Sequence, residues 1–116
     1  MKIRITAGRA AFTAEIDDSA AGRAFAERLP LTLDMSELNG NEKYARLAKP
    51  LPSAARHCAR LEAGDLMLYG ADCVVLFYGR AGGYSYTRLG RLVQTGGLAE
   101  ALGKGGVRVV FERFGA

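Results

Sequence analysis

Two short apolar runs in the middle of the chain constrain its fold more than any other feature. Residues 66–69 and 73–78 are apolar, and the turn Gly70-Ala71-Asp72 separates them. Two β-rich apolar runs joined by three residues that include glycine are typical of a β-hairpin. Because neither run alternates with polar residues, both faces of this hairpin should be covered, as in a closed or sandwiched sheet. We therefore expect the hairpin at the centre of the core.

Alternating apolar residues predict further strands on both sides of this hairpin. The expected strands are residues 2–6, 10–16, 31–35, 60–62, 84–93 and 107–114.

Two short helices are expected between these strands. Asp17-Asp18-Ser19 offers side-chain oxygens to the free N–H groups that begin a helix, and Pro30 ends that helix after about three turns. Thr95 is a candidate cap for a second helix, which Gly103 would end. About eight strands and two helices indicate a mainly β fold, either a barrel or a folded-over sheet.

The connections also have recognisable sequence signals. Residues 36–44 are polar and contain an Asn-Gly pair that tolerates positive φ, which predicts a turn. Residues 45–57 contain Pro50 and Pro52 and show little periodicity, so we expect a long loop that wraps the surface or carries function.

Length and charge limit the classes of function. With 116 residues, the sequence predicts one domain over residues 1–116. The net charge is +4, but the 16 Lys and Arg residues are interleaved with 12 acidic residues along the whole chain. A nucleic-acid footprint should be clustered, so we expect a mildly basic surface and no nucleic-acid partner.

Location and cofactors are predicted from absent signals. The start of the chain has no apolar leader segment, and residues 73–78 form the longest apolar run, far short of a membrane helix. We therefore expect a cytoplasmic protein with no membrane contact. Cys58, Cys73 and His57 lack metal-ligand spacing, so no metal and no cofactor are predicted, and both cysteines should stay thiols.

Tyr84, Tyr86 and Arg88 form the sharpest candidate site, because alternate residues of a strand share one face. A guanidinium beside aromatic rings can hold a carboxylate or a peptide carbonyl through paired hydrogen bonds. The structural alternative is an arginine stacked on the tyrosines and paired with Glu42 or Asp65, which would only stabilise the fold.

A second block, residues 39–44, either lines the same groove or forms a turn closed by its own Asn side chains. The expected ligand is a peptide segment or a small acidic molecule. The candidate groove residues are Asn39, Glu42, Tyr44, Tyr69, Tyr84, Tyr86 and Arg88.

Two other motifs carry little chemistry. His57 and Cys58 suggest a base and a thiolate, but neighbours in an extended segment point in opposite directions. Residues 103–106 are glycine-rich, yet they lack the phosphate-loop pattern and precede a strand.

Four segments in this order resemble the small bacterial and archaeal cyclophilin-like domain family: residues 31–35 (LTLDM), 38–44 (LNGNEKY), 64–70 (GDLMLYG) and 84–90 (YSYTRLG). The resemblance spans nearly the whole chain. It implies a closed, cyclophilin-type β-barrel with a helix near each end. It also implies a protein of a family largely without assigned activity.

Classical cyclophilins are peptidyl-prolyl isomerases that hold an X-Pro bond with an arginine, a phenylalanine, a glutamine and further aromatic or histidine residues. Those motifs do not map onto this chain, in which Gln94 is the only glutamine and tryptophan is absent. Arg88 is the one candidate for assisting amide rotation. A binding module is therefore the favoured function, with an isomerase or a structural or regulatory subunit as alternatives.

Overall fold

Nine β-strands and two α-helices make up the computed structural model, which describes residues 1–114. The strands are β1 (Lys2–Ala7), β2 (Ala10–Ile16), β3 (Leu31–Leu38), β4 (Glu42–Arg46), β5 (Arg56–Cys58), β6 (Asp65–Tyr69), β7 (Cys73–Phe77), β8 (Tyr84–Leu92) and β9 (Val107–Arg113). The helices are α1 (Ala20–Glu27) and α2 (Leu98–Leu102). The predicted mainly β class is confirmed.

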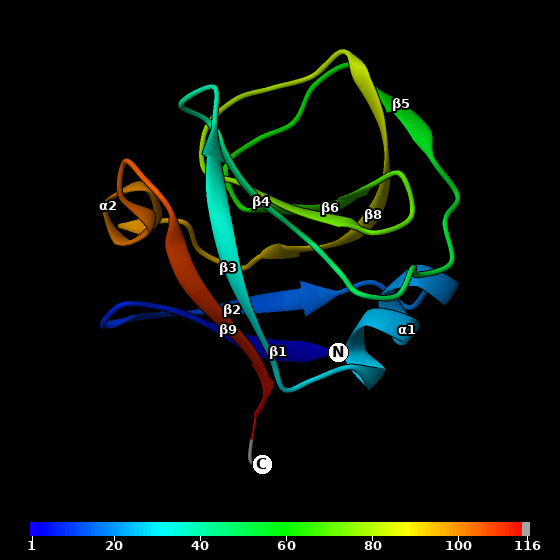
Figure 1. The fold of residues 1–116 in the computed structure, drawn as a ribbon, viewed down its shortest axis with the longest axis horizontal. Coiled ribbons are helices and arrows are strands. Elements are labelled where there is room, and N and C mark those ends of the chain that lie inside the picture. The colour runs from blue at the N-terminus through cyan, green and yellow to red at the C-terminus, as the bar shows by residue number, and fades with distance from the viewer. Residues whose placement is uncertain (115–116) are drawn as a thin grey trace.

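Eight of these strands close into an antiparallel barrel in the order β2-β1-β9-β3-β4-β7-β6-β8 (Figure 1). The seam between β2 and β8 closes it, with Ala14 opposite Leu92 and Ile16 opposite Gly90. A Cβ atom on Gly90 would lie 2.2 Å from the Glu15 carbonyl oxygen, so only glycine allows this approach. The ninth strand, β5, pairs with the other half of β8 outside the barrel.

The central hairpin forms as predicted. β6 and β7 pair in antiparallel register around the turn, and every residue in the two strands is buried except Tyr69. One face of the hairpin packs into the barrel interior, and the other contributes to a second, smaller core. Both faces are thus covered, which explains the lack of alternation in the sequence.

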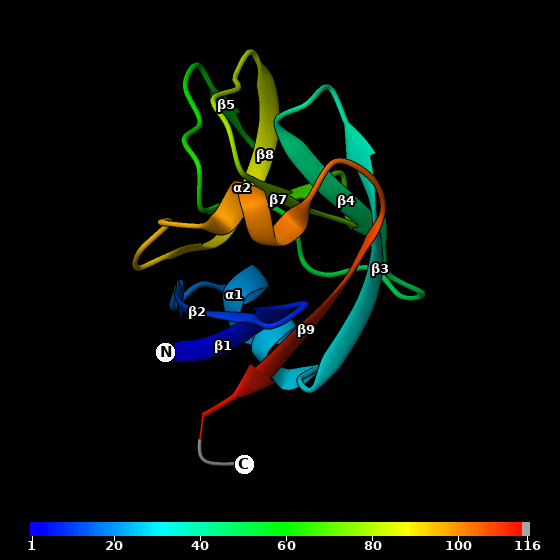
Figure 2. The same ribbon diagram turned by 90° about the vertical axis from the view of Figure 1, so that its left-hand side faces the viewer.

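The two helices lie at opposite ends of the barrel, as Figures 1 and 2 show. Ser19 caps α1 by accepting a hydrogen bond at Oγ from the Gly22 amide, and α1 buries Phe25 edge-on against Phe111. α1 is shorter than the expected three turns. The other expected cap is wrong: Gly97 precedes α2 in a left-handed conformation, and the Thr95 side chain caps nothing there.

None of the helices in the described part of the chain is both long and apolar enough to cross a membrane.

The segment expected to be a polar turn and a long loop contains more sheet than predicted. Strand β3 continues to Leu38 and β4 begins at Glu42, so the turn consists of residues 39–41, in which Asn39 and Gly40 have φ of 57° and 70°. The Gly40 amide donates to Glu37, so an upstream carboxylate closes the turn. The loop itself spans residues 47–55, and the strand expected at residues 60–62 is a single bridge at Leu61.

The sequence does not indicate β4, because a lysine at position 43 is typical of an exposed position and Lys43 is buried. Its side chain is fully buried and its Nζ donates to Glu37, at 2.9 Å, and to the carbonyls of Gly103 and Gly105, at 2.7 and 2.6 Å. Tyr78 donates to the same Glu37 carboxylate at 2.6 Å. This network ties the β3–β4 hairpin to the connection between α2 and β9.

A second core lies outside the barrel, over strands β6, β7 and β8. Its buried members are Leu61, Met67, Cys73, Val75, Phe77 and Tyr86. The main core fills the barrel interior. We therefore expect any ligand of this domain to meet the outer face, because buried side chains occupy the barrel interior.

Candidate binding site

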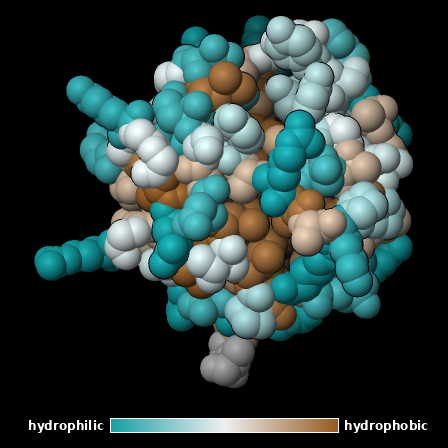
Figure 3. All heavy atoms as spheres, in the orientation of Figure 1, coloured by the Kyte–Doolittle hydropathy of each residue, from teal (hydrophilic) through white to brown (hydrophobic). Residues whose placement is uncertain are grey.

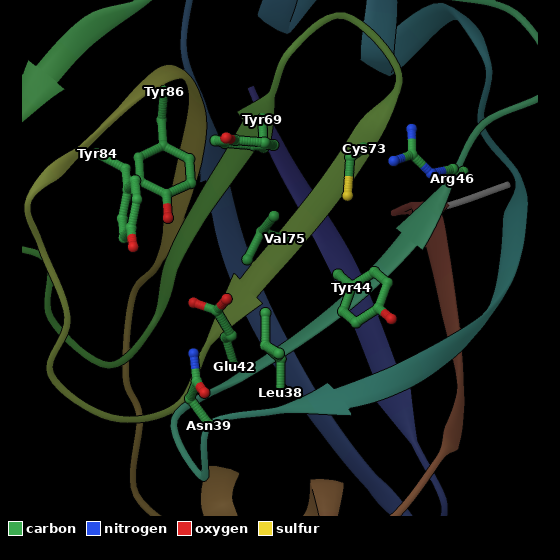
Figure 4. Close-up of a pocket in the computed structure, with 10 residues that line it drawn as sticks. All are labelled: Leu38, Asn39, Glu42, Tyr44, Arg46, Tyr69, Cys73, Val75, Tyr84 and Tyr86. Carbon is green, nitrogen blue, oxygen red and sulfur yellow. The ribbon is translucent and has the colours of Figure 1, made fainter.

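A hollow of about 350 Å³ opens on the outer face of the barrel beside the second core (Figure 4). We call it the tyrosine hollow. It is lined by Leu38, Asn39, Glu42, Tyr44, Arg46, Tyr69, Cys73, Val75, Tyr84 and Tyr86. Figure 3 shows apolar atoms recessed between polar side chains on one face of the molecule.

The structure brings six of the seven predicted groove residues together in this hollow. They come from the turn before β4, from β4 itself, from β6 and from β8. The seventh, Arg88, lies outside the lining. The sequence did not point to Leu38, Arg46, Cys73 or Val75.

Strand β4 supplies one wall because its residues alternate between the two faces of the sheet. Glu42, Tyr44 and Arg46 face the hollow, whereas Lys43 and Ala45 face the interior. The missed residue Arg46 follows from the same period of two, starting at Glu42 and Tyr44. Pro50 and Pro52 indicate a loop over residues 45–57, and this loop signal conceals the continuation of the strand to Arg46.

Aromatic rings form the opposite wall. The rings of Tyr69 and Tyr86 lie 5.6 Å apart between centroids, tilted by 58°, and Phe77 packs edge-on against Tyr86 from below. Tyr86 is only 6% exposed, whereas Tyr84 is 64% exposed at the rim. Phe77 therefore holds one ring of the wall in place, while Tyr84 remains accessible.

Glu42 is the buried charged group of the hollow. The residue is 8% exposed, and Figure 4 shows its carboxylate directed toward the hydroxyl ends of Tyr84 and Tyr86. The Glu42 backbone pairs with β3 and β7, but among residues 1–114 its side-chain carboxylate accepts no hydrogen bond and enters no ion pair. Burial raises the pKa of Glu42, and the nearby negative charge of Glu37 raises it further.

Two other ionisable groups around Glu42 have raised pKa values, and a third is paired. Burial raises the pKa of Tyr86 to about 12, and the Glu42 charge adds to that shift. Burial also raises the pKa of the Cys73 thiol. Arg46, at the far rim, pairs with Asp72 at 3.0 Å and is well exposed. The hollow thus presents one unmatched negative charge.

Arg88 lies in a second hollow, of about 630 Å³, between the start of α1, residues 52–61 and strand β8. We call it the arginine hollow, because Arg56, Arg60 and Arg88 line it. Arg88 Nε donates to Asp17 Oδ2 at 2.9 Å. Arg88 thus forms an ion pair, as the structural alternative predicted, but its partner is Asp17 and not Glu42 or Asp65. Tyr86 lines both hollows.

His57 and Cys58 both line the arginine hollow. The Cys58 thiol donates to the Arg56 carbonyl at 3.4 Å rather than to His57. Within residues 1–114, no three His, Cys, Asp or Glu side chains gather as metal ligands do.

The comparisons with known proteins agree with this architecture. The profile of the Cyclophilin-like family matches residues 5–112. The chain belongs to that family. No curated protein matches this cyclophilin-like chain.

A solved structure shows the same fold. The solution structure of a hypothetical protein from Archaeoglobus fulgidus superposes with a TM-score of 0.59 at 24% identity, covering 97% of this chain and 94% of that one. The likeness supports the cyclophilin-like barrel and carries no activity with it.

Proposed function

We propose that this cyclophilin-like domain is a binding module that receives a peptide segment or small ligand in the tyrosine hollow. One observation carries the proposal. Four tyrosines surround the hollow, and among the described residues none of their hydroxyls makes a hydrogen bond; Tyr78, elsewhere, does. Rigid rings with free polar ends supply contact area and adaptable hydrogen bonds, which is why tyrosine is enriched in binding surfaces.

The size and chemistry of the hollow support the same proposal. Its volume of about 350 Å³ falls within the range of roughly 300–1,000 Å³ common for ligand pockets. The lining combines aromatic and aliphatic side chains with a few polar groups, chiefly Asn39 and Glu42. In such a lining, apolar contacts supply most of the binding area, and a few polar groups fix the orientation of the ligand.

The arginine hollow offers a continuation for a longer ligand. Tyr86 lines both hollows, so a peptide segment that fills one can extend past this ring to the other. Arg56 and Arg60 form no ion pair within residues 1–114, whereas Arg88 is held by Asp17. An acidic group of such a peptide would meet the two unpaired arginines.

A panel of short peptides tests the binding function. We would titrate the ¹⁵N-labelled chain with acetylated, amidated pentapeptides whose central residue is apolar, aromatic, acidic, basic or proline. At least one peptide should shift backbone signals of Val75, Tyr84 and Tyr86. Tyr84→Ala should weaken that binding without unfolding the chain, because Tyr84 is 64% exposed.

If no peptide moves those signals at millimolar concentration, the proposed binding function is wrong. The proline peptide also tests the isomerase alternative. If the chain accelerates its cis–trans exchange, the function is catalytic rather than binding alone.

A further inference from the structure

The unmatched carboxylate of Glu42 limits which ligands the tyrosine hollow can accept. Glu42 is 8% exposed, and its carboxylate has no hydrogen-bond or ion-pair partner among residues 1–114. The carboxylate oxygens open onto the hollow and are not fully enclosed, since the enclosed side-chain atom without a partner in residues 1–114 is Asn41 Oδ1. A carboxylate largely withdrawn from water without a partner is costly, and natural proteins pair such groups. A cation that entered the hollow would supply the missing partner, whereas an anion would be repelled.

The walls of the hollow suit a cation of a particular kind. Tyr69 and Tyr86 present rings at 58° to one another, and Tyr84 stands beside Tyr86 with its hydroxyl directed toward Glu42 (Figure 4). The face of an aromatic ring is negative and attracts an ammonium group within about 6 Å of its centroid. Angled rings beside a carboxylate are therefore a favourable environment for a weakly hydrated cation.

The scarcity of acceptors distinguishes between cations. A guanidinium carries five N–H donors, and the side chains that line the hollow offer it the Glu42 carboxylate and the tyrosine hydroxyls, whereas Figure 4 shows the Asn39 amide nitrogen, itself a donor, on the side of Glu42. An ammonium has at most three donors, and each methyl group removes one while adding apolar surface for the rings. A metal ion would find a single carboxylate, since no three ligating side chains gather in the described residues.

We propose that the tyrosine hollow binds an alkylammonium group, methylated or not, with Glu42 as its counter-ion and Tyr69, Tyr84 and Tyr86 as its walls. This inference rests on the proposed function, because it names the ligand class of the same hollow. The alkylammonium can belong to a lysine side chain of a peptide or to a free small amine. Both present the same charge and shape.

Binding should weaken as the pH falls, because only ionised Glu42 attracts the cation. The titratable and charged groups that line the hollow with Glu42 are Tyr44 and Arg46 of β4, Tyr69 of β6, Cys73 of β7, and Tyr84 and Tyr86 of β8. Glu37 and Lys43 lie nearby on the other face of the β3–β4 hairpin. The pKa of Glu42 is raised and that of Tyr86 is about 12. The affinity should therefore rise through the raised pKa of Glu42 and stay constant from there to mildly alkaline pH.

Choline and its uncharged carbon isostere, in which a tert-butyl group replaces the trimethylammonium group, separate charge from shape. In NMR titrations of the ¹⁵N-labelled chain we expect choline to bind at least about tenfold more tightly than the isostere. Glu42→Gln should reduce choline affinity to the level of the isostere. Glu100→Gln, which removes an exposed charge on α2, should change it less than twofold.

A second comparison identifies the source of the ammonium group. A pentapeptide with a central trimethyllysine should bind more tightly than choline if the natural ligand is a peptide, because its backbone adds contacts along the hollow. Equal affinities indicate a free small amine. Each result is compared with the matching norleucine peptide, which lacks the charge.

Three results would overturn the inference. Equal binding of choline and its isostere would show that charge does not matter, while leaving the hollow as a binding site. If the Glu42→Gln variant binds choline with unchanged affinity, Glu42 is not the counter-ion. If neither probe shifts the signals of the hollow while a peptide of the earlier panel does, the ligand class is wrong but the binding function stands.

Discussion

At the scale of single residues, Glu42 and Lys43 are neighbours with opposite roles. Lys43 is fully buried and satisfied by three acceptors, whereas Glu42 is almost as buried and faces an open hollow without a partner. Strand alternation places them on opposite faces of the sheet. The charge of Lys43 thus stabilises the fold, whereas the neighbouring charge of Glu42 destabilises it. A destabilising charge of this kind is expected where a functional residue lowers stability.

The first prediction concerns the stability cost of Glu42. Glu42→Gln should raise the free energy of unfolding at pH 7 by on the order of 1 kcal/mol, because it removes a buried, unpaired charge. A raised pKa means that the folded state prefers protonated Glu42. The stabilisation that folding gains from protonated Glu42 is therefore fully present below the ordinary pKa of 4.5. It is lost as the pH rises through the raised pKa of Glu42 in the folded state.

The advantage of the glutamine variant should consequently be larger at pH 7 than at pH 4, as measured by urea unfolding at both values. A variant less stable than the parent at pH 7 would show that Glu42 is a structural residue.

Lys43 carries the opposite prediction. Lys43→Met should destabilise the chain by about 2–3 kcal/mol, because it removes a fully buried ammonium that donates to Glu37 and to the carbonyls of Gly103 and Gly105. Arg46→Met on the same strand is the matched control. It removes an exposed pair with Asp72 and should cost no more than about 1 kcal/mol in the same urea experiment. Similar losses in both variants would contradict the structural role of Lys43.

At the scale of elements, the hairpin of β6 and β7 could be predicted because burial on both faces leaves continuous apolar runs in the sequence. Strand β4 could not, because buried Lys43 reads as a surface residue until its partners on the α2–β9 connection are known. The ion pair of Arg88 with Asp17 could not be predicted from the sequence either. It joins residues 71 positions apart, and only the barrel seam brings them together.

Closure of the barrel at the β2–β8 seam makes a prediction of its own. Gly90→Ala should cost at least about 2 kcal/mol, since its Cβ would lie 2.2 Å from the Glu15 carbonyl oxygen. Gly96→Ala, where nothing lies within 4 Å, should change stability by less than about 0.5 kcal/mol. Hydrogen exchange should localise the damage to the seam amides of Asp17 and Val93. Unchanged protection of those amides would mean that the seam tolerates a side chain.

At the scale of the whole molecule, the barrel is a support for its outer face. The interior is filled by the main core and each end is covered by a helix, so no lumen remains for a ligand. Six of the residues predicted from the sequence meet in the tyrosine hollow. Strand alternation predicted that Tyr84 and Tyr86 share a face, and the polar block of residues 39–44 was one of two alternatives, a groove wall or a turn. The sequence could not predict that Arg88 would lie in a separate hollow, since that depends on the start of α1 and residues 52–61, which pack beside this part of β8.

The distribution of tyrosines allows a direct test of where ligands bind. The chain has five tyrosines, four of which line the hollow, while Tyr78 donates to Glu37 elsewhere and serves as an internal reference. With ¹³C-labelled tyrosine rings, a saturating choline titration should shift the signals of Tyr69, Tyr84 and Tyr86 and leave that of Tyr78 in place. Unmoved tyrosine signals, or a Tyr78 signal that moves as far as the others, would contradict binding in the hollow.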